Sequence, residues 1–325
     1  MKFILGIDIA KDKFDCCLLS EGRKFHQEFL NGPRGFKQLL GWLQKADASP
    51  AALWACMEAT GIYGEALLRF LFEKGLRVSK VNPAQIKHYA RSLLSRNKTD
   101  RQDAWIIAEF ARERSASGQL RIWQPPSPAI ARLRQLTRLL AARKGQRARE
   151  KRRARMVDRE LRAHTRAMLR AFEKQIDAIE AEINALIASS AELKRRHDLL
   201  RSIPCVGPVT AQTVLAELPE QIANARAAAA YAGVTPRRED SGQKKGRARL
   251  SKTGNAHLRQ ALYMPASSGR KTNPRLRACA QRLAQKGKTR KLAIGACMHL
   301  LLRLCVGVMA SGKPFDPHWP KQPMR

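Results

Sequence analysis

Four acidic residues in the first third of the chain occupy positions where their carboxylates could bind a divalent cation. Asp8 is the single acid in the apolar run 3–10, and Glu58 closes the apolar run 53–58 just before the turn at Gly61. An unpaired carboxylate inside a buried strand would cost several kcal/mol of lost hydration. Something must compensate these charges, and a divalent cation is the natural candidate.

A second pair of acids begins a predicted helix. The segment Thr99-Asp-Arg-Gln102 fits a capping box, in which Thr99 is the N-cap and Gln102 reaches back to it. Asp100 and Asp103 then lie three residues apart in the first turn, on one face of the helix. The helix dipole also favours acids in a first turn, so this pair by itself has an equally good structural explanation.

Taken together, the four acids predict a magnesium site for phosphodiester chemistry. Mg²⁺ prefers oxygen ligands, and two such ions about 4 Å apart stabilise both the attacking and the leaving oxygen of a phosphodiester. Carboxylates from two strand ends and one helix would supply that site, as catalytic and metal-binding groups: Asp8, Glu58, Asp100 and Asp103. Three neighbouring acids are predicted to be ordinary surface residues: Asp12, Asp15 and Glu65.

Ser241 lies in a polar, basic loop in the last third of the chain. A serine hydroxyl is a poor nucleophile until a base or a metal ion helps to remove its proton. The nearest histidine, His257, is predicted to begin a helix. Basic side chains around the serine would hold a phosphate and stabilise transition-state charge; they are Arg237, Arg238, Lys244, Lys245, Arg247, Arg249 and Lys252. The residues alone favour an ordinary serine in a basic loop, and a nucleophilic serine is the alternative.

The whole chain is strongly basic, and its positive charge is unevenly distributed. It has 62 Lys and Arg against 27 Asp and Glu, a formal net charge of +35. Residues 1–125 have 20 basic and 13 acidic side chains, whereas residues 126–325 have 42 and 14. Such a surplus indicates a polyanionic partner, although ribosomal and architectural proteins show it too. The division predicts acidic chemistry in the first part and nucleic-acid binding in the second.

Two segments of the second part concentrate the basic charge. Residues 143–159 have nine basic side chains against two acids, and residues 270–291 have nine with no acid. We predict that the first segment contacts phosphates, through side chains that include Arg147, Arg152 and Arg153. A solvated, charged helix face is the alternative.

The elements that must position the acids begin with strands and then alternate between helix and strand. The sequence predicts strands at 2–9, 14–20, 23–30, 51–57 and 77–81, and helices at 34–45, 65–74, 84–94 and 100–114. The first three strands form a predicted antiparallel meander. This order is the one expected of a ribonuclease-H-like α/β domain.

A proline-rich break at 123–128 separates this part from a proline-free stretch that lasts until Pro204. That stretch predicts one very long helix or a helical pair. An apolar seam typical of a coiled coil runs through it at Phe172, Ile176, Ile179, Ile183 and Leu186. Residues 200–211 resemble a helix-hairpin-helix turn in which Cys205 replaces the first glycine, so a phosphate-binding and a purely structural hairpin are both open. The predicted domains are 1–125, a coiled-coil linker 126–198, and a mainly helical domain 199–325.

Cysteine usage and the apolar segments predict a cytoplasmic protein without a membrane span. The seven cysteines have no zinc-binding spacing, and their odd number favours free thiols. No signal peptide opens the sequence. The most apolar segment, 292–309, has His299 and Arg303 near its middle, which predicts a core helix.

Motifs distributed over nearly the whole chain resemble the DEDD transposases of the insertion-sequence-110 family, which also includes the Piv-type DNA invertases. Those in the first part are Gly6-Ile-Asp-Ile-Ala-Lys11, Glu58-Ala-Thr-Gly-Ile-Tyr63, Val81-Asn-Pro83 and Asn97-Lys-Thr-Asp-Arg-Gln-Asp-Ala104. Those in the second part include Tyr231-Ala-Gly-Val-Thr-Pro-Arg237, Asp240-Ser-Gly242, Leu250-Ser-Lys-Thr-Gly-Asn255 and Arg259-Gln-Ala-Leu-Tyr-Met-Pro-Ala266. Each motif is short, but their order and spacing together are specific.

The resemblance implies a RuvC-like domain whose acid tetrad (Asp8, Glu58, Asp100 and Asp103) binds Mg²⁺, followed by a coiled-coil linker and a transposase domain. By motif position, its nucleophilic serine is Ser241. Family members form dimers that pair into tetramers, place the serine of one subunit beside the tetrad of another, and join a circularised element to target DNA. Some are directed by an element-encoded RNA that pairs with donor and target DNA. The expected activity is DNA strand transfer through a covalent phosphoserine, in the bacterial cytoplasm at the nucleoid.

Two other functions are compatible with the residues. A RuvC-like junction nuclease would use water as its nucleophile, and Ser241 would then be incidental. A basic scaffold that binds RNA or DNA would need no working tetrad, although the presence of all four acids counts against it.

Overall fold

The computed structural model describes residues 3–59, 61, 63–94, 99–222, 224–237 and 249–318. The chain divides into two compact units, Met1–Pro125 and Pro126–Arg325, called here the N-terminal and the C-terminal unit. Each has its own hydrophobic core. Each is therefore described by itself.

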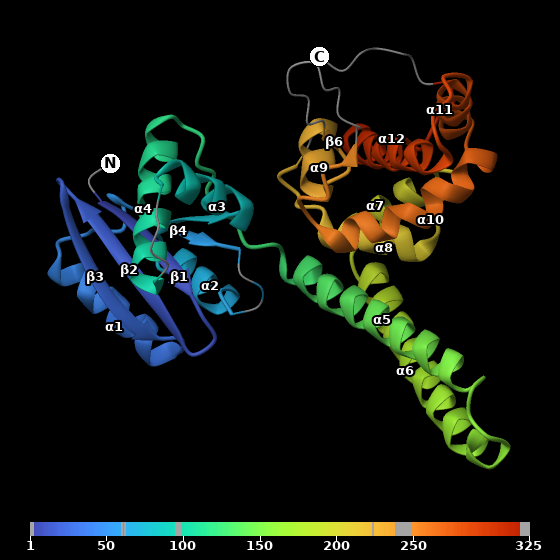
Figure 1. Ribbon diagram of the computed structural model, residues 1–325, viewed down its shortest axis with the longest axis horizontal. Helices are drawn as coiled ribbons and strands as arrows, with labels where there is room; N and C mark the ends of the chain where they lie inside the picture. The colour runs from blue at the N-terminus through green and yellow to red at the C-terminus, as the bar shows by residue number, and fades with distance from the viewer. Residues whose placement is uncertain are drawn as a thin grey trace. The chain divides into compact units, whose positions relative to one another are not determined.

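The N-terminal unit is an α/β domain whose elements follow the predicted order to within a few residues. Its strands are β1 (Phe3–Ile9), β2 (Lys13–Ser20), β3 (Arg23–Leu30), β4 (Leu53–Glu58) and β5 (Arg77–Val81). Its helices are α1 (Pro33–Lys45), α2 (Glu65–Glu73), α3 (Pro83–Ser92) and α4 (Asp100–Ala116) (Figure 1). The prediction of three strands followed by alternating helix and strand is confirmed.

The strands form one sheet in the order β3-β2-β1-β4-β5. β1, β2 and β3 pair antiparallel as a meander, whereas β4 pairs parallel to β1 and β5 parallel to β4. Parallel neighbours need crossover connections, which here contain α1 and α2. The ends of β1 and β4 therefore meet at one edge of the sheet, where Asp8 and Glu58 lie.

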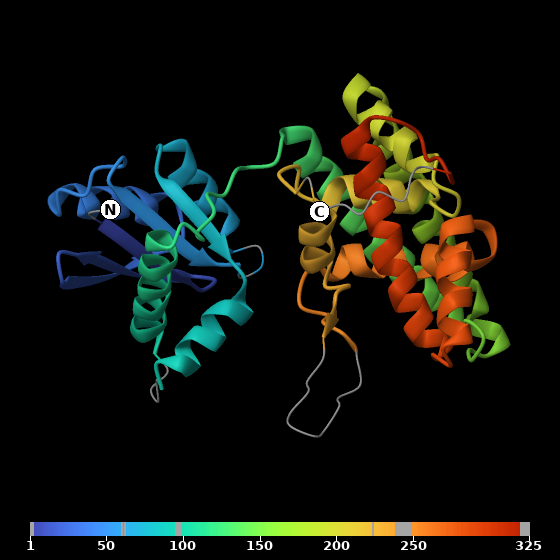
Figure 2. The ribbon, with the colours of Figure 1, turned by 90° about the horizontal axis from the view of Figure 1, so that it is seen from above.

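Helices cover both faces of the sheet, as Figure 2 shows, with α1 and α2 on one side and α3 and α4 on the other. Successive side chains of β1 point to opposite faces of the sheet, so this strand contributes to the core on each face. Leu5 and Ile7 point into the core with α1 and α2, whereas Ile4 points into the core with α3 and α4. Asp8 has the same parity as Ile4, so it lies on the α4 face.

Gly6 lets α4 lie directly against the centre of β1. A Cβ atom at Gly6 would overlap the backbone of Ala104 and Ala108 in α4. Only a residue without a side chain allows this approach. The contact sets the position of α4, and therefore of the two acids in its first turn, relative to Asp8.

Replacing Gly6 by Ala is expected to lower the free energy of unfolding by about 3 kcal/mol, since α4 must move off the sheet to admit the methyl group. Any activity that needs the acids of α4 beside Asp8 should fall with it. Gly41 in α1 is a matched control, because a Cβ there meets no atom within 4 Å. Gly41→Ala should keep or slightly raise stability in the same thermal unfolding assay. Equal melting temperatures for Gly6→Ala and the wild type would contradict this packing.

The C-terminal unit is mainly helical. Its helices are α5 (Pro128–Arg153), α6 (Arg162–Ala188), α7 (Ala191–Arg201), α8 (Pro208–Glu217), α9 (Ala225–Ala232), α10 (Ala256–Thr272), α11 (Pro274–Gln285) and α12 (Arg290–Ser311). It also contains the short 3-10 helix η1 (Arg159–Leu161) and the two-residue strands β6 (Pro236–Arg237) and β7 (Arg249–Leu250).

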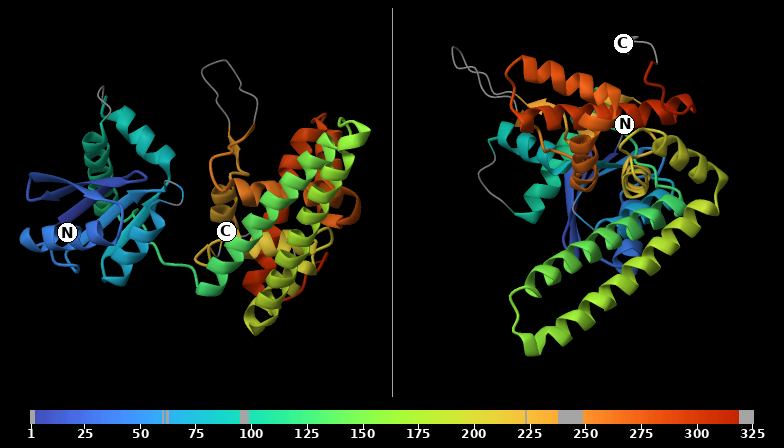
Figure 3. Two further views of the ribbon diagram at one scale, coloured as in Figure 1. Left: turned by 90° about the horizontal axis from the view of Figure 1, so that it is seen from below. Right: turned by 90° about the vertical axis from the view of Figure 1, so that its right-hand side faces the viewer.

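The long proline-free stretch forms a helical pair, α5 and α6, which run side by side in both panels of Figure 3. Three residues of the predicted seam, Ile176, Ile179 and Ile183, are buried, while Phe172 and Leu186 are half-buried. Their core also contains apolar residues of α7, α8, α10 and α12. Residues 126–198 thus share a core with residues 199–325, and a coiled coil as such stays a prediction.

The turn between α7 and α8 packs inside this unit. Cys205 has a φ of 82°, a backbone conformation that favours glycine. Its side chain packs so closely against Gly269 of α10 that a Cβ there would lie 2.6 Å from the Cys205 sulfur. Asn273 also donates a hydrogen bond of 3.2 Å from Nδ2 to the carbonyl oxygen of Pro204. These contacts support the structural hairpin, and a phosphate-binding role stays a prediction.

Helix α12 is the predicted core helix. Among the described residues, it is long and apolar enough by composition to cross a membrane. Its buried residues, which include Cys297, Leu301 and Cys305, pack in the core of the C-terminal unit.

Candidate active site

Acidic side chains form a row across four strands of the N-terminal sheet. In the antiparallel register Asp8 lies opposite Asp15, and Asp15 lies opposite Glu28. On the other side of β1, Ile7 pairs with Met57, so that Glu58 is the next residue of β4 beside Asp8. Residues directly opposite each other point to the same face of a sheet. The row therefore faces α4.

The first turn of α4 adds two more acids above this row. The hydroxyl of Thr99 accepts a hydrogen bond of 3.2 Å from the backbone N–H of Gln102, which confirms the predicted N-cap. The backbone N–H of Asp103 donates to the carbonyl oxygen of Thr99. Asp100 and Asp103 occupy this first turn, where the helix dipole favours their charge.

The other three acids of the predicted tetrad act on the pKa of Asp8. Burial raises this pKa to about 6, and repulsion by Asp103, Asp100, Glu58 and Asp15, in that order, adds to the rise. Like charges disfavour one another's ionisation only when they are near. Asp8 and Glu58 are half-buried and Asp100 is exposed, so the group opens to solvent.

The prediction that Asp15 is a surface residue is wrong. Its exposed fraction is 4%, and Oδ1 lies 3.0 Å from Nε2 of His26. The reason is strand register, because Asp15 lies directly opposite Asp8 and faces α4. Asp12 lies in a turn and Glu65 on an exposed helix face, and both are exposed as predicted. Asp15 is the single acid in the apolar run 14–19, so the signal that located Asp8 was also present at Asp15.

Lys13 is the second site residue that the sequence did not indicate. Its Nζ lies 2.7 Å from Oε2 of Glu28, 3.2 Å from Oδ2 of Asp100 and 3.8 Å from Oδ2 of Asp15. Hydrogen bonds to Glu28 and Asp100 raise the pKa of Lys13, so its ammonium stays charged. It joins the acid row to the first turn of α4.

The chemistry of the tetrad suits magnesium. Its donors are all carboxylate oxygens, which hard cations prefer. A divalent cation would also relieve the repulsion that raises the pKa of Asp8. Among the described residues, no three His, Cys, Asp or Glu side chains lie close enough together to form a metal cluster. The four predicted ligands are therefore neighbours, but they do not form a closed coordination sphere.

Comparison with known proteins matches two regions of the chain to transposase families. Residues 5–160 match the transposase family DEDD_Tnp_IS110, and residues 197–281 match the family described as Transposase IS116/IS110/IS902. The chain is 33% identical over 321 residues to the pilin gene-inverting protein of Moraxella bovis, covering 97% of this chain and 98% of that protein. The chain belongs to the IS110 family of transposases.

Two further relatives are similar to this chain over most of its length. The pilin gene-inverting protein of Moraxella lacunata is also 33% identical, with the same coverage. The transposase for insertion sequence element IS1111A of Coxiella burnetii is 27% identical, over 80% of this chain and 75% of its own. Among solved structures, Thermus RuvC with a Holliday junction covers 38% of this chain at 14% identity and a TM-score of 0.29, values at which likeness carries no weight.

Ser241 lies outside the described residues, as do Arg238, Lys244, Lys245 and Arg247. The structure does describe the base of their loop. Strands β6 and β7 form an antiparallel ribbon in which Arg237 pairs with Arg249 (Figure 2). The backbone N–H of Ser251 donates to the carbonyl oxygen of Thr235 at 2.9 Å, and that of Lys252 to Gly233 at 3.1 Å. The side chains of Arg237, Arg249 and Lys252 are exposed at this base.

A buried carboxylate anchors the segment that follows the ribbon. Glu217 at the end of α8 is 1% exposed. Its Oε1 accepts from Nε of Arg138 at 2.6 Å, and its Oε2 accepts from Nη2 of Arg138 at 2.9 Å and from Nδ2 of Asn255 at 2.7 Å. Asn255 is also the N-cap of α10, accepting from the N–H of Leu258. Glu217 thus links α5, α8 and the start of α10. Nothing in its local sequence indicated this role.

Glu217→Gln is expected to lower the free energy of unfolding by about 2 kcal/mol at pH 7, because it removes a charge-assisted, buried pair. Burial acts to raise the pKa of Glu217, but the bonds from Arg138 and Asn255 outweigh it and lower this pKa. The stabilisation is therefore present above the unfolded-state pKa and is lost as pH falls through the folded-state pKa.

Urea unfolding at pH 7 and at pH 3 tests this pH dependence. The difference in free energy of unfolding between Glu217→Gln and the wild type should be smaller at pH 3. The control is Glu192→Gln, because Glu192 also forms a two-bond pair, with Arg195, but on an exposed helix surface. That variant should change stability little. A Glu217→Gln protein as stable as wild type at pH 7 would refute the anchoring role.

The basic residues predicted to bind phosphate at the end of α5 are accessible. Arg152 and Arg153 are exposed and Arg147 is half-exposed, and Arg153 pairs with Glu150 at 3.6 Å. α11 and the residues flanking it add further exposed basic side chains, which include Lys271, Arg277 and Lys286. These side chains are accessible to solvent, and their contact with phosphates stays a prediction.

Proposed function

We propose that this transposase cuts and rejoins DNA strands by Mg²⁺-assisted attack of Ser241 on a phosphodiester, through a covalent phosphoserine. The observation that supports the proposal is that Asp8 and Glu58 lie on the face of the sheet covered by α4, whose first turn carries Asp100 and Asp103. Burial and repulsion by these acids raise the pKa of Asp8 to about 6. A carboxylate cluster of this kind is costly to the fold and suits a divalent cation.

In this mechanism Asp8, Glu58, Asp100 and Asp103 would hold Mg²⁺, which would supply Lewis-acid stabilisation of the attacking and leaving oxygens. The Ser241 oxygen forms a bond to phosphorus, and the bond from phosphorus to one deoxyribose oxygen breaks. The departing oxygen gains a proton as the serine loses its own. A deoxyribose hydroxyl of the second DNA then attacks the phosphoserine and releases the serine. Water is not the nucleophile in either step, so each phosphoester bond that breaks is replaced by another and the exchange is reversible.

The proposed partners are donor and target DNA and an element-encoded guide RNA. Exposed basic side chains at the end of α5 and around α11 support binding of a polyanion. Lys and Arg contacts to phosphate carry no base information, so pairing with a guide RNA would supply the sequence specificity. We also propose a homodimer that pairs into a tetramer, in which the serine and the tetrad of one reaction centre come from different subunits.

Trapping the protein on DNA tests the chemistry. Wild-type protein is incubated with Mg²⁺ and end-labelled DNA containing the element junction, and the reaction is stopped in SDS. We expect a labelled DNA strand that migrates with the protein and is released by protease. Cleaved DNA without attached protein would instead identify a hydrolytic nuclease, and uncleaved DNA under every condition would identify a binding scaffold.

A further inference from the structure

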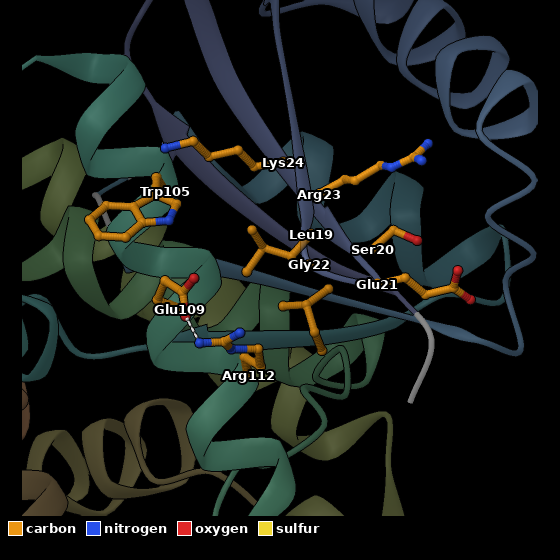
Figure 4. Close-up of a pocket in the computed structure, with 10 residues that line it drawn as sticks. Leu19, Ser20, Glu21, Gly22, Arg23, Lys24, Trp105, Glu109 and Arg112 are labelled. Atoms are coloured by element: carbon orange, nitrogen blue, oxygen red, sulfur yellow. Dashed lines mark ion pairs between the residues drawn. The ribbon is translucent and has the colours of Figure 1, made fainter.

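A cavity of about 380 Å³ opens on the α4 face of the N-terminal sheet, away from the acid row. Its floor is apolar and consists of Ile4 and Leu19, which pair in register between β1 and β2. Trp105 of α4 forms one wall, and Lys24 of β3 crosses its mouth (Figure 4). The mechanism proposed above does not use this cavity.

The charged groups of the cavity are arranged around the indole ring. Nζ of Lys24 lies 5.5 Å from the centre of the Trp105 ring. Below the ring, Glu109 and Arg112 form an ion pair on α4 (Figure 4). The Glu109 side chain is 14% exposed, whereas that of Arg112 is 59% exposed. The cavity thus combines a planar aromatic face, an ammonium, a carboxylate and a guanidinium.

The same strand and the same helix connect the cavity to the tetrad. Ile4 and Asp8 lie on one face of β1, four residues apart, which corresponds to about 13 Å along a strand. Asp103 and Trp105 both belong to α4. An unpaired strand advances further per nucleotide than the ~3.4 Å of a duplex strand, so 13 Å corresponds to at most about four nucleotide steps. A nucleic-acid strand that runs from the tetrad along α4 therefore reaches the cavity within a few nucleotides.

We infer that this cavity binds the base of an unpaired nucleotide in the DNA strand held at the tetrad; the inference rests on the proposed function. The base stacks between the Trp105 ring and the apolar floor formed by Ile4 and Leu19. Stacking on an aromatic side chain is open to any base, because every base has a π-face. Lys24 exchanges its place over the ring for a contact with the adjacent phosphate.

The hydrogen-bonding groups fit the edge of a base. One oxygen of the Glu109 carboxylate pairs with Arg112, so its other oxygen would accept from an amino or ring N–H group. The remaining N–H groups of Arg112 would donate to a ring nitrogen or carbonyl oxygen. A free nucleoside triphosphate fits less well, because Glu109 and Glu21 place two carboxylates among the lining residues. An unpaired base outside the duplex is what strand exchange generates, so the cavity would hold the parted strand in register with the tetrad.

The test uses full-length protein with EDTA, so that binding is measured without chemistry. The probes are single-stranded tetradeoxynucleotides with one 2-aminopurine at the first, second, third or fourth position. Stacking in the cavity should quench the 2-aminopurine strongly at one position. Trp105→Leu should weaken binding of that probe about tenfold, whereas Trp105→Phe, which keeps an aromatic ring, should stay within about threefold of wild type.

Lys24→Ala supplies a second variant that leaves the packing of Trp105 on its helix intact. It should reduce the slope of log affinity against log salt by about one, as loss of one phosphate contact does. Lys37→Ala is its control, because Lys37 is exposed on α1, on the opposite face of the sheet. That variant should behave as wild type.

Three results would overturn the inference: equal quenching at all four positions, equal affinity of Trp105→Leu and Trp105→Phe, or binding of deoxyadenosine monophosphate as tight as that of the tetranucleotide. The last would identify a mononucleotide site. The fluorescence readout requires neither Mg²⁺ nor Ser241. If strand transfer is absent but 2-aminopurine is still quenched at one position, the proposed mechanism is wrong and the base-binding cavity stands.

Discussion

Asp8→Asn is expected to reduce DNA strand cleavage about a thousandfold, which corresponds to about 4 kcal/mol of transition-state stabilisation. Asp8 lies at the centre of the acid row, between Asp15 and Glu58, and faces both acids of α4. An amide cannot supply the second anionic oxygen that a hard cation requires. DNA binding should remain near wild type, because the basic surfaces of the C-terminal unit are unchanged.

The same substitution should stabilise the metal-free protein. The pKa of Asp8 is raised to about 6 in the folded state, above its ordinary value of 3.8. The contribution of Asp8 to the free energy of unfolding is therefore greatest below the ordinary pKa, and it is lost as the pH rises through 6. At pH 7 the half-buried charge lowers the free energy of unfolding by about 2 kcal/mol once solvent screening is allowed for, and Asn removes this cost. The gain should vanish near pH 4.

Thermal unfolding in EDTA at both pH values measures this difference, and unfolding with Mg²⁺ completes the test. Magnesium should raise the melting temperature of the wild type more than that of Asp8→Asn. Asp12→Asn is the control, because Asp12 is an exposed acid in the turn after β1. Unimpaired cleavage by Asp8→Asn would remove the tetrad from the mechanism.

Ser241→Ala should abolish the covalent adduct between protein and DNA while leaving DNA binding near normal. Alanine has no oxygen to form the phosphoserine, so no residual nucleophilic route exists at this position. The reaction is assayed by SDS-resistant labelling of the protein with end-labelled DNA. Removal of the hydroxyl should leave the fold intact, since the described base of the loop is held by β6, β7 and backbone hydrogen bonds.

Ser251→Ala is the matched control for this experiment. Ser251 is the nearest rival serine, and its hydroxyl accepts a hydrogen bond of 3.3 Å from that of Thr235 at the base of the loop. Its loss should leave adduct formation within about threefold of wild type, because one net hydrogen bond contributes about 0.5–1.5 kcal/mol. An adduct that persists in Ser241→Ala and disappears in Ser251→Ala would transfer the nucleophile to Ser251.

Local signals in the sequence predicted much of the N-terminal unit. A lone acid in an apolar strand located Asp8, and the pattern Thr99 to Gln102 located the helix start that carries Asp100 and Asp103. These signals depend on periodicity, burial and capping, which act over a few residues. The IS110 motifs extended them to the whole chain because their order and spacing are specific.

The sequence by itself therefore determined the order of the elements, the four tetrad acids as candidates, and the family. Only the tertiary structure decided that Asp15 is buried opposite Asp8, that Lys13 joins Glu28 to Asp100, and that Trp105 and Lys24 enclose one cavity. Each of these contacts depends on strand register or on the approach of α4 at Gly6. A residue's own neighbours in the sequence carry no information about which strand or helix will face it.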